Sequence, residues 1–150
     1  VYSRMQSITY ANGYQREVGS RRVYNANHMP QNLPTPAVVL LQGPESVDNR
    51  IGDRYQCSLV VTIGFVDTFA GKDSDAEANE FLADIQKALS SPEISYTTTN
   101  YSSGASVTTS ATVLEIINSL NSGDLMKGRV HGELDVSVGY VRSIFDPQKQ

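Results

Sequence analysis

The sequence has few of the side chains that most often carry chemistry. Its 150 residues include no Trp, one Cys and two His. A single cysteine excludes an intrachain disulfide, and Cys57 falls on the apolar side of a predicted strand, which predicts a small buried hydrophobe rather than a thiol nucleophile. His28 and His131 lie far apart, in a predicted loop and on a polar strand face. They are therefore predicted to be surface side chains rather than metal ligands.

Positive charge is also scarce. The chain has 12 Lys and Arg against 16 Asp and Glu, a formal net charge of -4. This excess of acids disfavours a protein that wraps nucleic acid through many phosphate contacts, although it permits DNA to pass without being held. No apolar run approaches the roughly 18 residues needed to span a bilayer, and no leader is recognisable, so we predict a soluble protein with no membrane contact.

Two long stretches predict half-buried strands. From Arg54 to Asp67 the odd positions are apolar up to Phe65, while polar and small residues predominate between them. The stretch from Val130 to Tyr140 repeats this alternation on its even positions. Two such strands in a chain of 150 residues predict a single domain, residues 1–150, built on an antiparallel sheet with one face covered.

One principal helix is predicted over about residues 74–90. Ser74 and Glu77 have the spacing of a capping box, and Ser90-Ser91-Pro92 ends the pattern. The helix has one apolar stripe, formed by Ala78, Phe81, Leu82, Ile85 and Leu89. It is the expected cover for the apolar face of the sheet. A second, short helix is predicted within residues 1–13, where Asn12-Gly13 supplies a left-handed stop.

The first half of the chain predicts shorter elements. Residues 21–25 are a short strand candidate, and the prolines between residues 28 and 36 predict an extended connector. Ala37 to Leu41 is a compact apolar run closed by Gly43-Pro44, which predicts a strand buried on both faces. The polar residues from Glu45 to Asp53 are then expected to form a long hairpin loop.

The second half is less periodic. Residues 96–111 are rich in Ser and Thr and predict an exposed ribbon or loop. Residues 112–120 fit either a capped helix or a strand, and their β-branched content favours the strand. A polar connection is expected over residues 119–128, and a polar tail begins at Asp146. The predicted fold class is therefore α+β, a mostly antiparallel sheet with the principal helix on one face and a short N-terminal helix.

Acidic clusters are the strongest catalytic candidates in the sequence, and none is convincing. Glu133 and Asp135 share one side of a strand about 7 Å apart, as paired catalytic carboxylates do, but alternate strand residues on a solvated face are polar by default. The acids at positions 73, 75 and 77 lack the spacing of a calcium loop and suit the start of a helix without any ion. We therefore predict no enzymatic activity, no metal and no cofactor.

Strand length predicts an oligomer. Eleven extended residues cover roughly 36 Å, about the diameter of a compact globule of this chain length. The long strands are thus expected to reach or pass the edge of the subunit. Strands that outrun their own core usually lie against a neighbour, which predicts a homo-oligomer.

The order of the elements resembles that of the tail terminator proteins of long-tailed bacteriophages, also called tail completion proteins. The features that carry the resemblance are Ala11-Asn12-Gly13-Tyr14 after a short helix, Val18-Gly19, the proline-led run Leu33–Leu41, the alternating strand Arg54–Asp67, the helix Asp75–Leu89 and the closing strand Gly132–Tyr140. They span nearly the whole chain.

The resemblance implies a structural protein of the virion, made in the host cytoplasm. Members of this family form a ring, usually a hexamer, on the head-proximal end of the tail tube. They end tube polymerisation and present a docking surface to the head connector. The implied partners are further copies of the chain, the tail tube protein, the head-tail connector protein and genomic DNA that passes through the channel without specific binding.

Six charged residues are candidates for lining the channel or the contacts between subunits: Glu45, Asp48, Arg50, Asp53, Glu133 and Asp135. Acids at these positions would avoid holding DNA phosphates. Another connector, stopper or tube subunit is an alternative within the same class. A small-ligand-binding or enzymatic α+β domain with a cleft between helix and sheet is the alternative from another class, and a cellular adaptor that adds a partner's strand to a sheet edge is a third.

Overall fold

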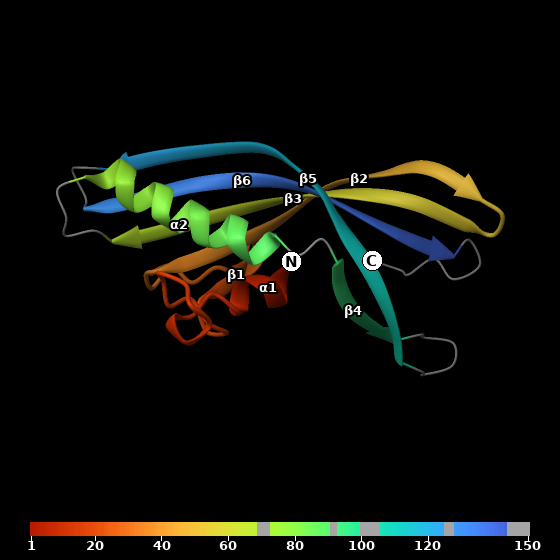
Figure 1. Ribbon diagram of the computed structural model, residues 1–150, viewed down its shortest axis with the longest axis horizontal. Helices are drawn as coiled ribbons and strands as arrows, with labels where there is room; N and C mark the ends of the chain where they lie inside the picture. The colour runs from red at the N-terminus through yellow and green to blue at the C-terminus, as the bar shows by residue number, and fades with distance from the viewer. Residues whose placement is uncertain (69–72, 91–92, 100–105, 125–127, 144–150) are drawn as a thin grey trace.

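The computed structural model describes residues 1–68, 73–90, 93–99, 106–124 and 128–143 (Figure 1). Within them the predicted α+β class is confirmed. The elements in chain order are α1 (Tyr2–Gln6), the 3-10 helix η1 (Tyr10–Asn12), β1 (Val23–Asn25), the 3-10 helix η2 (Ala26–His28), β2 (Ala37–Ile51), β3 (Arg54–Thr68), α2 (Ser74–Leu89), β4 (Glu93–Thr99), β5 (Ser106–Asp124) and β6 (Arg129–Ser143).

The described strands form one sheet in the order β1-β2-β3-β6-β5-β4. All neighbours are antiparallel except β1 and β2, which are parallel. The centre of the sheet is the β3–β6 pair, which runs from Arg54 opposite Ser143 to Thr68 opposite Arg129 without a register shift. This pair contains the two alternating stretches from which the sheet was predicted.

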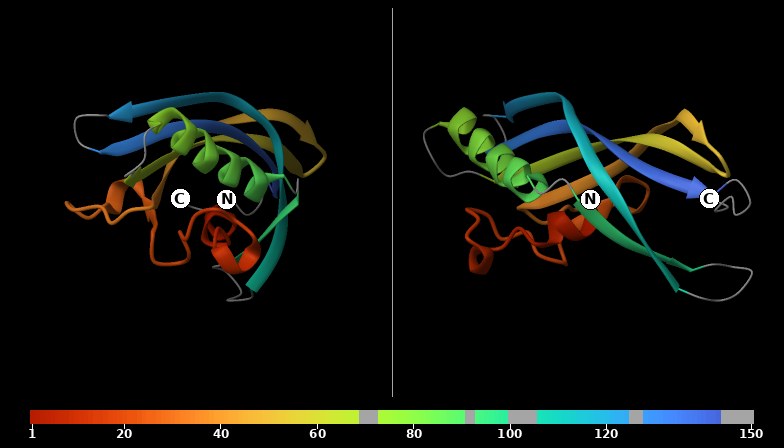
Figure 2. Two further views of the ribbon diagram at one scale, coloured as in Figure 1. Left: turned by 60° about the vertical axis from the view of Figure 1, so that its left-hand side comes forward. Right: turned by 45° about the vertical axis from the view of Figure 1, so that its right-hand side comes forward.

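Both α-helices lie on the same side of the sheet, and no described α-helix lies on the other face (Figure 2). The stripe of α2 packs on the odd positions of β3 and the even positions of β6, as predicted. Phe81 is fully buried and its ring centroid lies 4.8 Å from that of Phe65. Four residues of the N-terminal segment complete this core: Met5, Ile8, Val18 and Val23.

The N-terminal helix is shorter than the predicted range allows. α1 stops at Gln6, and the separate helix η1 ends at Asn12. Its C-cap, Gly13, has a φ of 77°, which confirms the predicted left-handed stop. The strand expected over residues 21–25 is β1, and no described strand or α-helix occupies the proline-rich residues 29–36.

The predicted hairpin loop from Glu45 to Asp53 was wrong, because β2 continues to Ile51. A two-residue turn at Gly52-Asp53 joins it to β3, and Gly52 supplies the positive φ of 61° that such turns need. Gly43-Pro44 does not close the strand but sits at a register shift between Gln42 and Glu45. A Cβ on Gly43 would lie 3.0 Å from the Val60 carbonyl oxygen, which explains glycine at this bulge.

Two further predictions about β2 and α2 need correction. The run Ala37–Leu41 is not buried on both faces, since Leu41 is 47% exposed on the side away from α2. The cap of α2 is Asp73 rather than Ser74: its carboxylate accepts from the backbone N–H groups of Asp75 and Ala76. With the N-cap at Asp73, Glu77 does not form the expected capping box, and its carboxylate pairs with Arg16 instead.

The ambiguous residues 112–120 are strand, and the polar connection expected from residue 119 starts later, because β5 continues to Asp124. Within the Ser/Thr-rich stretch 96–111, residues 96–99 and 106–111 form a ribbon, since β4 pairs with the first part of β5, and residues 100–105 lie outside the described residues. The C-terminal tail from residue 146 lies outside the described residues.

The central contact of the core gives a stability prediction. Phe81→Ala should lower the free energy of unfolding by about 3–5 kcal/mol, because it empties a fully buried aromatic site. Gln86→Ala, on the exposed side of the same helix, should change it by less than about 0.5 kcal/mol. Urea unfolding of both variants measures the difference, and equal losses would contradict the packing described above.

Candidate functional site

Half of the sheet extends past the elements that cover it. We call this extension the arm and define it as residues 45–59 of β2 and β3 with residues 138–143 of β6. Val138 still belongs to the core and Leu59 packs against it, so the five β3 residues 54–58 carry the sheet about 16 Å past the core, at about 3.3 Å per residue. Apolar side chains are exposed along it: Val47 is 50%, Ile51 64% and Val141 45% exposed. The arm is therefore a long, thin projection with apolar residues in water (Figure 1).

A polar cluster links all three strands of the arm on the side facing α2. The Tyr140 hydroxyl donates to Glu45 Oε2, and Arg142 Nη1 lies 3.0 Å from Glu45 Oε1. The Arg142 guanidinium also lies 5.9 Å from the centroid of the Tyr55 ring. Because β2 and β3 each contribute one of these partners and β6 contributes two, the cluster holds the three strands in register where no described helix packs on them.

Two ionisable side chains of the arm have raised pKa values. Burial raises the pKa of Tyr140 above its ordinary value, and the hydrogen bond and negative charge of Glu45 raise it further. Burial also raises the pKa of the Cys57 thiol, with Arg142 acting in the opposite direction. Cys57 is fully buried, which confirms its predicted role as a small apolar side chain rather than a thiolate.

The face of the sheet away from α2 is the second candidate surface, and we call it the uncovered face. It carries the even positions of β3 and the odd positions of β6. The side chains at its centre are short and several carry hydroxyl groups. Thr62 Oγ1 donates to Asp135 Oδ1 at 2.6 Å. Farther along, Asp48 Oδ1 accepts from the Ser46 and Ser58 hydroxyls at 2.8 and 3.1 Å.

A shallow depression of about 350 Å³ lies on the uncovered face. Its polar side chains are His131 and Glu133, both exposed. The remaining lining comes from Leu33, Val39, Gly64, Phe65, Val66 and Gly132. The depression is open and mostly apolar, unlike the deep sites with convergent polar groups that bind small ligands.

The six predicted site residues do not converge. Asp48, Glu133 and Asp135 lie on the uncovered face, spread along its length. Glu45 and Arg50 lie on the opposite side of the arm, where Glu45 binds Tyr140 and Arg142. Arg50 donates through Nε to the Gly52 carbonyl at 3.2 Å, and Asp53 is exposed in the turn. They mark two surfaces rather than one centre.

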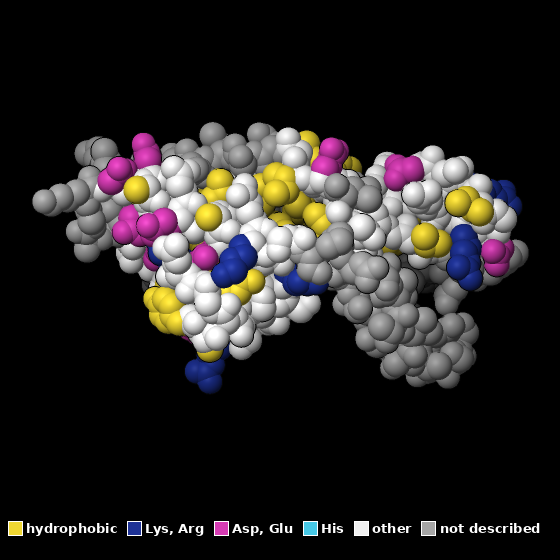
Figure 3. Space-filling model, viewed as in Figure 1, with side chains coloured by type: hydrophobic (Ala, Val, Ile, Leu, Met, Phe, Trp, Pro, Cys, Tyr) yellow, Lys and Arg dark blue, Asp and Glu magenta, His cyan; other side chains and the backbone are white. Residues whose placement is uncertain are grey.

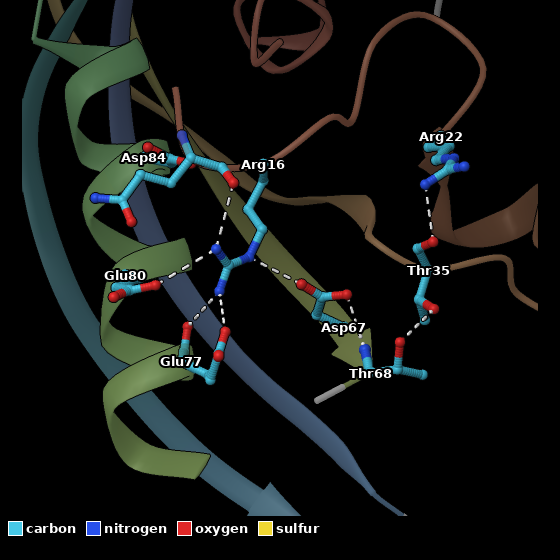
Figure 4. A network of polar contacts seen from close by, with 9 residues as sticks. Arg16, Arg22, Thr35, Asp67, Thr68, Glu77, Glu80 and Asp84 are labelled. Atoms are coloured by element: carbon cyan, nitrogen blue, oxygen red, sulfur yellow. Dashed lines mark hydrogen bonds and ion pairs between the residues drawn. The ribbon is translucent and has the colours of Figure 1, made fainter. Parts of the chain in front are cut away.

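Sequence reasoning missed Arg16, whose guanidinium contacts three carboxylates. Figure 4 shows its guanidinium between β3 and α2, with Nε 2.9 Å from Asp67 Oδ2 and Nη2 paired with Glu77. Nη1 lies 3.5 Å from Glu80 Oε2, and the guanidinium carbon is 6.0 Å from the Phe81 ring centroid. Arg16 is 9% exposed, so these contacts clamp the N-terminal segment onto the core.

The sequence feature that could have predicted this contact lies in α2 rather than around Arg16. Glu77, Glu80 and Asp84 are spaced three and four residues apart, which places them along one side of α2 beside its apolar stripe. Asp84 is 4% exposed, and its Oδ2 accepts from the Gln15 backbone N–H at 2.8 Å. An acidic row bordering a buried stripe requires a cation or backbone donors from elsewhere in the chain.

Acidic side chains also gather on the outside of α2 near its first turn, where Figure 3 shows them at the left of the molecule. They include Asp73, whose carboxylate caps the helix N-terminus as described above, and Asp75 in the first turn. Across the described ranges, no three His, Cys, Asp or Glu side chains group as metal ligands. No helix among those residues is both long and apolar enough to cross a bilayer.

Comparison with models of known protein families and with curated protein sequences gives no match.

The buried carboxyl of Asp84 predicts a pH effect on stability. Burial raises its pKa above the ordinary 3.8, outweighing the donors from Gln15 and Arg16. The folded state then binds the proton more tightly than the unfolded state, so this group's contribution to stability falls as pH rises from 3.8 through the folded-state pKa.

Asp84→Asn removes this titration. The free energy of unfolding of the variant, minus that of the unmodified chain, should therefore rise with pH above 3.8 and then level off. Urea unfolding measured across this range gives the difference at each pH. Asp75→Asn, at an exposed position of the same helix, is the control and should show no such rise. A difference for Asp84→Asn that is constant with pH would contradict the assignment.

Proposed function

We propose that this chain is the subunit of a non-enzymatic ring in a bacteriophage virion, which caps the head-proximal end of the tail tube, ends its polymerisation and docks the head connector. The observation that carries the proposal is the arm. It extends about 16 Å past the core and exposes Val47, Ile51 and Val141 to water. A lone subunit gains little from a projection of this kind, whereas a neighbour can bury it.

The arm suits a contact between unlike surfaces. Its apolar side chains lie on both sides of a thin sheet, with Val47 on the side of Tyr140 and Ile51 and Val141 on the other. Among the described residues, the helix-covered half of the molecule has no matching projection. A contact between the arm of one copy and the body of the next is head-to-tail, and such contacts close into a ring when the rotation between copies allows it.

The uncovered face suits the wall of a DNA channel. Its acids include Asp48, Glu133 and Asp135, and its centre has short side chains rather than lysines or arginines. The arginines of this face, Arg54 and Arg129, lie at its two ends, so its centre gives phosphates no cation to hold and lets DNA slide. The overall charge of -4 is compatible with the same requirement. In this proposal the ring is a hexamer and takes no cofactor.

Electron microscopy of the purified chain, alone and mixed with tail tube subunits, tests the proposal. Rings that cap tube ends and stop their growth would support a terminator. Rings that stack into tubes, or that bind only the connector, would instead indicate a tube subunit or a connector protein. A monomer at every concentration and with every partner would overturn the proposal.

The channel assignment gives a separate prediction. Glu133→Lys should make assembled rings retain double-stranded DNA, because each copy then presents a cation to the passing phosphates, and added salt should abolish the retention. Asp75→Lys makes the same change in net charge on the outside of α2 and should have little effect. Co-sedimentation of DNA with the rings measures both variants, and equal retention would place Glu133 outside the channel.

A further inference from the structure

The long free edges of the sheet differ in how they are protected against pairing. Beyond its contact with β1, the outer edge of β2 is interrupted by Pro44 and by two register shifts. The outer edge of β5 beyond β4 begins with two register shifts and continues as Asn118–Asp124, whose Asn, Ser, Gly and Asp are poor strand formers. Bulges, prolines and poor strand formers are common ways of preventing a sheet edge from adding another strand.

The outer edge of β4 has none of these protections. β4 pairs with β5 over all seven residues, Glu93 to Thr99, without a register shift. It contains no proline, glycine or lysine, and its residues after Glu93 are the strand formers Ile, Tyr and Thr, with one Ser. No described strand pairs with its other edge. Backbone N–H and C=O groups that no described strand pairs with therefore line an edge of seven residues.

We infer that β4 is a self-association strand, which pairs antiparallel with β4 of a second copy across a two-fold axis. The second copy is favoured because β4 is the only free edge of this length, among the described strands, that has both regular pairing and strand-forming residues. β1, at the far end of the sheet, has three residues, and the free part of β6 is the three residues 141–143. Neither of these edges is long enough to pair with all seven residues of β4.

The sequence of β4 is compatible with this symmetry. A two-fold axis at Tyr96 places Glu93 opposite Thr99, Ile94 opposite Thr98 and Ser95 opposite Thr97. No two charges of the same sign face each other, and the Ser–Thr and aromatic pairs are among those that stabilise neighbouring antiparallel strands. The contact does not depend on the proposed ring. If the ring exists, the two-fold contact joins two rings face to face; without it, the contact makes a dimer.

Disulfide trapping in the full chain tests the contact directly. Tyr96→Cys places two thiols opposite each other across the axis, with Cα atoms about 4.5–5.5 Å apart, which a disulfide can bridge. Ser95→Cys places them about 8 Å apart, too far to bridge without backbone movement. Cys57 is fully buried, so few disulfide-linked dimers should form through this native cysteine. We expect most Tyr96→Cys chains and few Ser95→Cys chains to form dimers under mild oxidation, measured by intact mass.

A charge-pair experiment provides the second readout. Ser95→Lys with Thr97→Lys puts like charges opposite each other at both pairs and should halve the particle mass measured by light scattering. Ser95→Glu with Thr97→Lys changes the same two positions but makes opposite charges face each other, and should keep the mass of the unmodified chain. Circular dichroism checks that both variants fold.

The two proposals fail in different ways. Equal trapping of both cysteine variants, or a particle mass that the paired lysines leave unchanged, would overturn the β4 contact whether or not rings form. A dimer that the paired lysines convert to a monomer would support the β4 contact and contradict the ring.

Discussion

The uninterrupted pairing of β3 with β6 is the constraint on which the rest of the molecule depends. Both strands have 15 residues, and their register continues from the core into the arm without a shift. Because side chains alternate strictly along such a pair, one register decides which residues α2 covers and which residues form the uncovered face. The core, the arm and the candidate channel wall are therefore consequences of a single alignment.

The two halves of this pair are stabilised by different forces. In the core, burial of apolar side chains dominates, and Arg16 fixes the N-terminal segment through contacts to β3 and α2. In the arm the polar cluster of Glu45, Tyr140 and Arg142 replaces the hydrophobic layer. A buried or half-buried network of this kind keeps a definite geometry only while every partner is present. The exposed apolar residues of the arm lie outside this network.

The sequence predicted the elements whose pattern is local. Strict alternation identified β3 and β6, and the apolar stripe identified α2. When one face of a strand or helix is buried, apolar residues must recur with the period of that element. It failed from Glu45 to Ile51, where an arm solvated on both sides has no apolar alternation and looks like a loop. It also missed Arg16, whose partners lie more than 50 positions away at Asp67, Glu77 and Glu80. Contacts of that kind depend on the folded topology, which no local pattern reports.

β5 takes part in two pairings in succession, and this has a mechanical consequence. Its first residues pair with β4 on one edge, and from Ala111 onward its opposite edge pairs with β6. The β4–β5 hairpin is thus not a flap on a flexible hinge, because the strand that carries it is part of the main sheet. A load applied to the hairpin is transmitted along β5 into the half of the sheet that α2 covers, where many backbone hydrogen bonds share it.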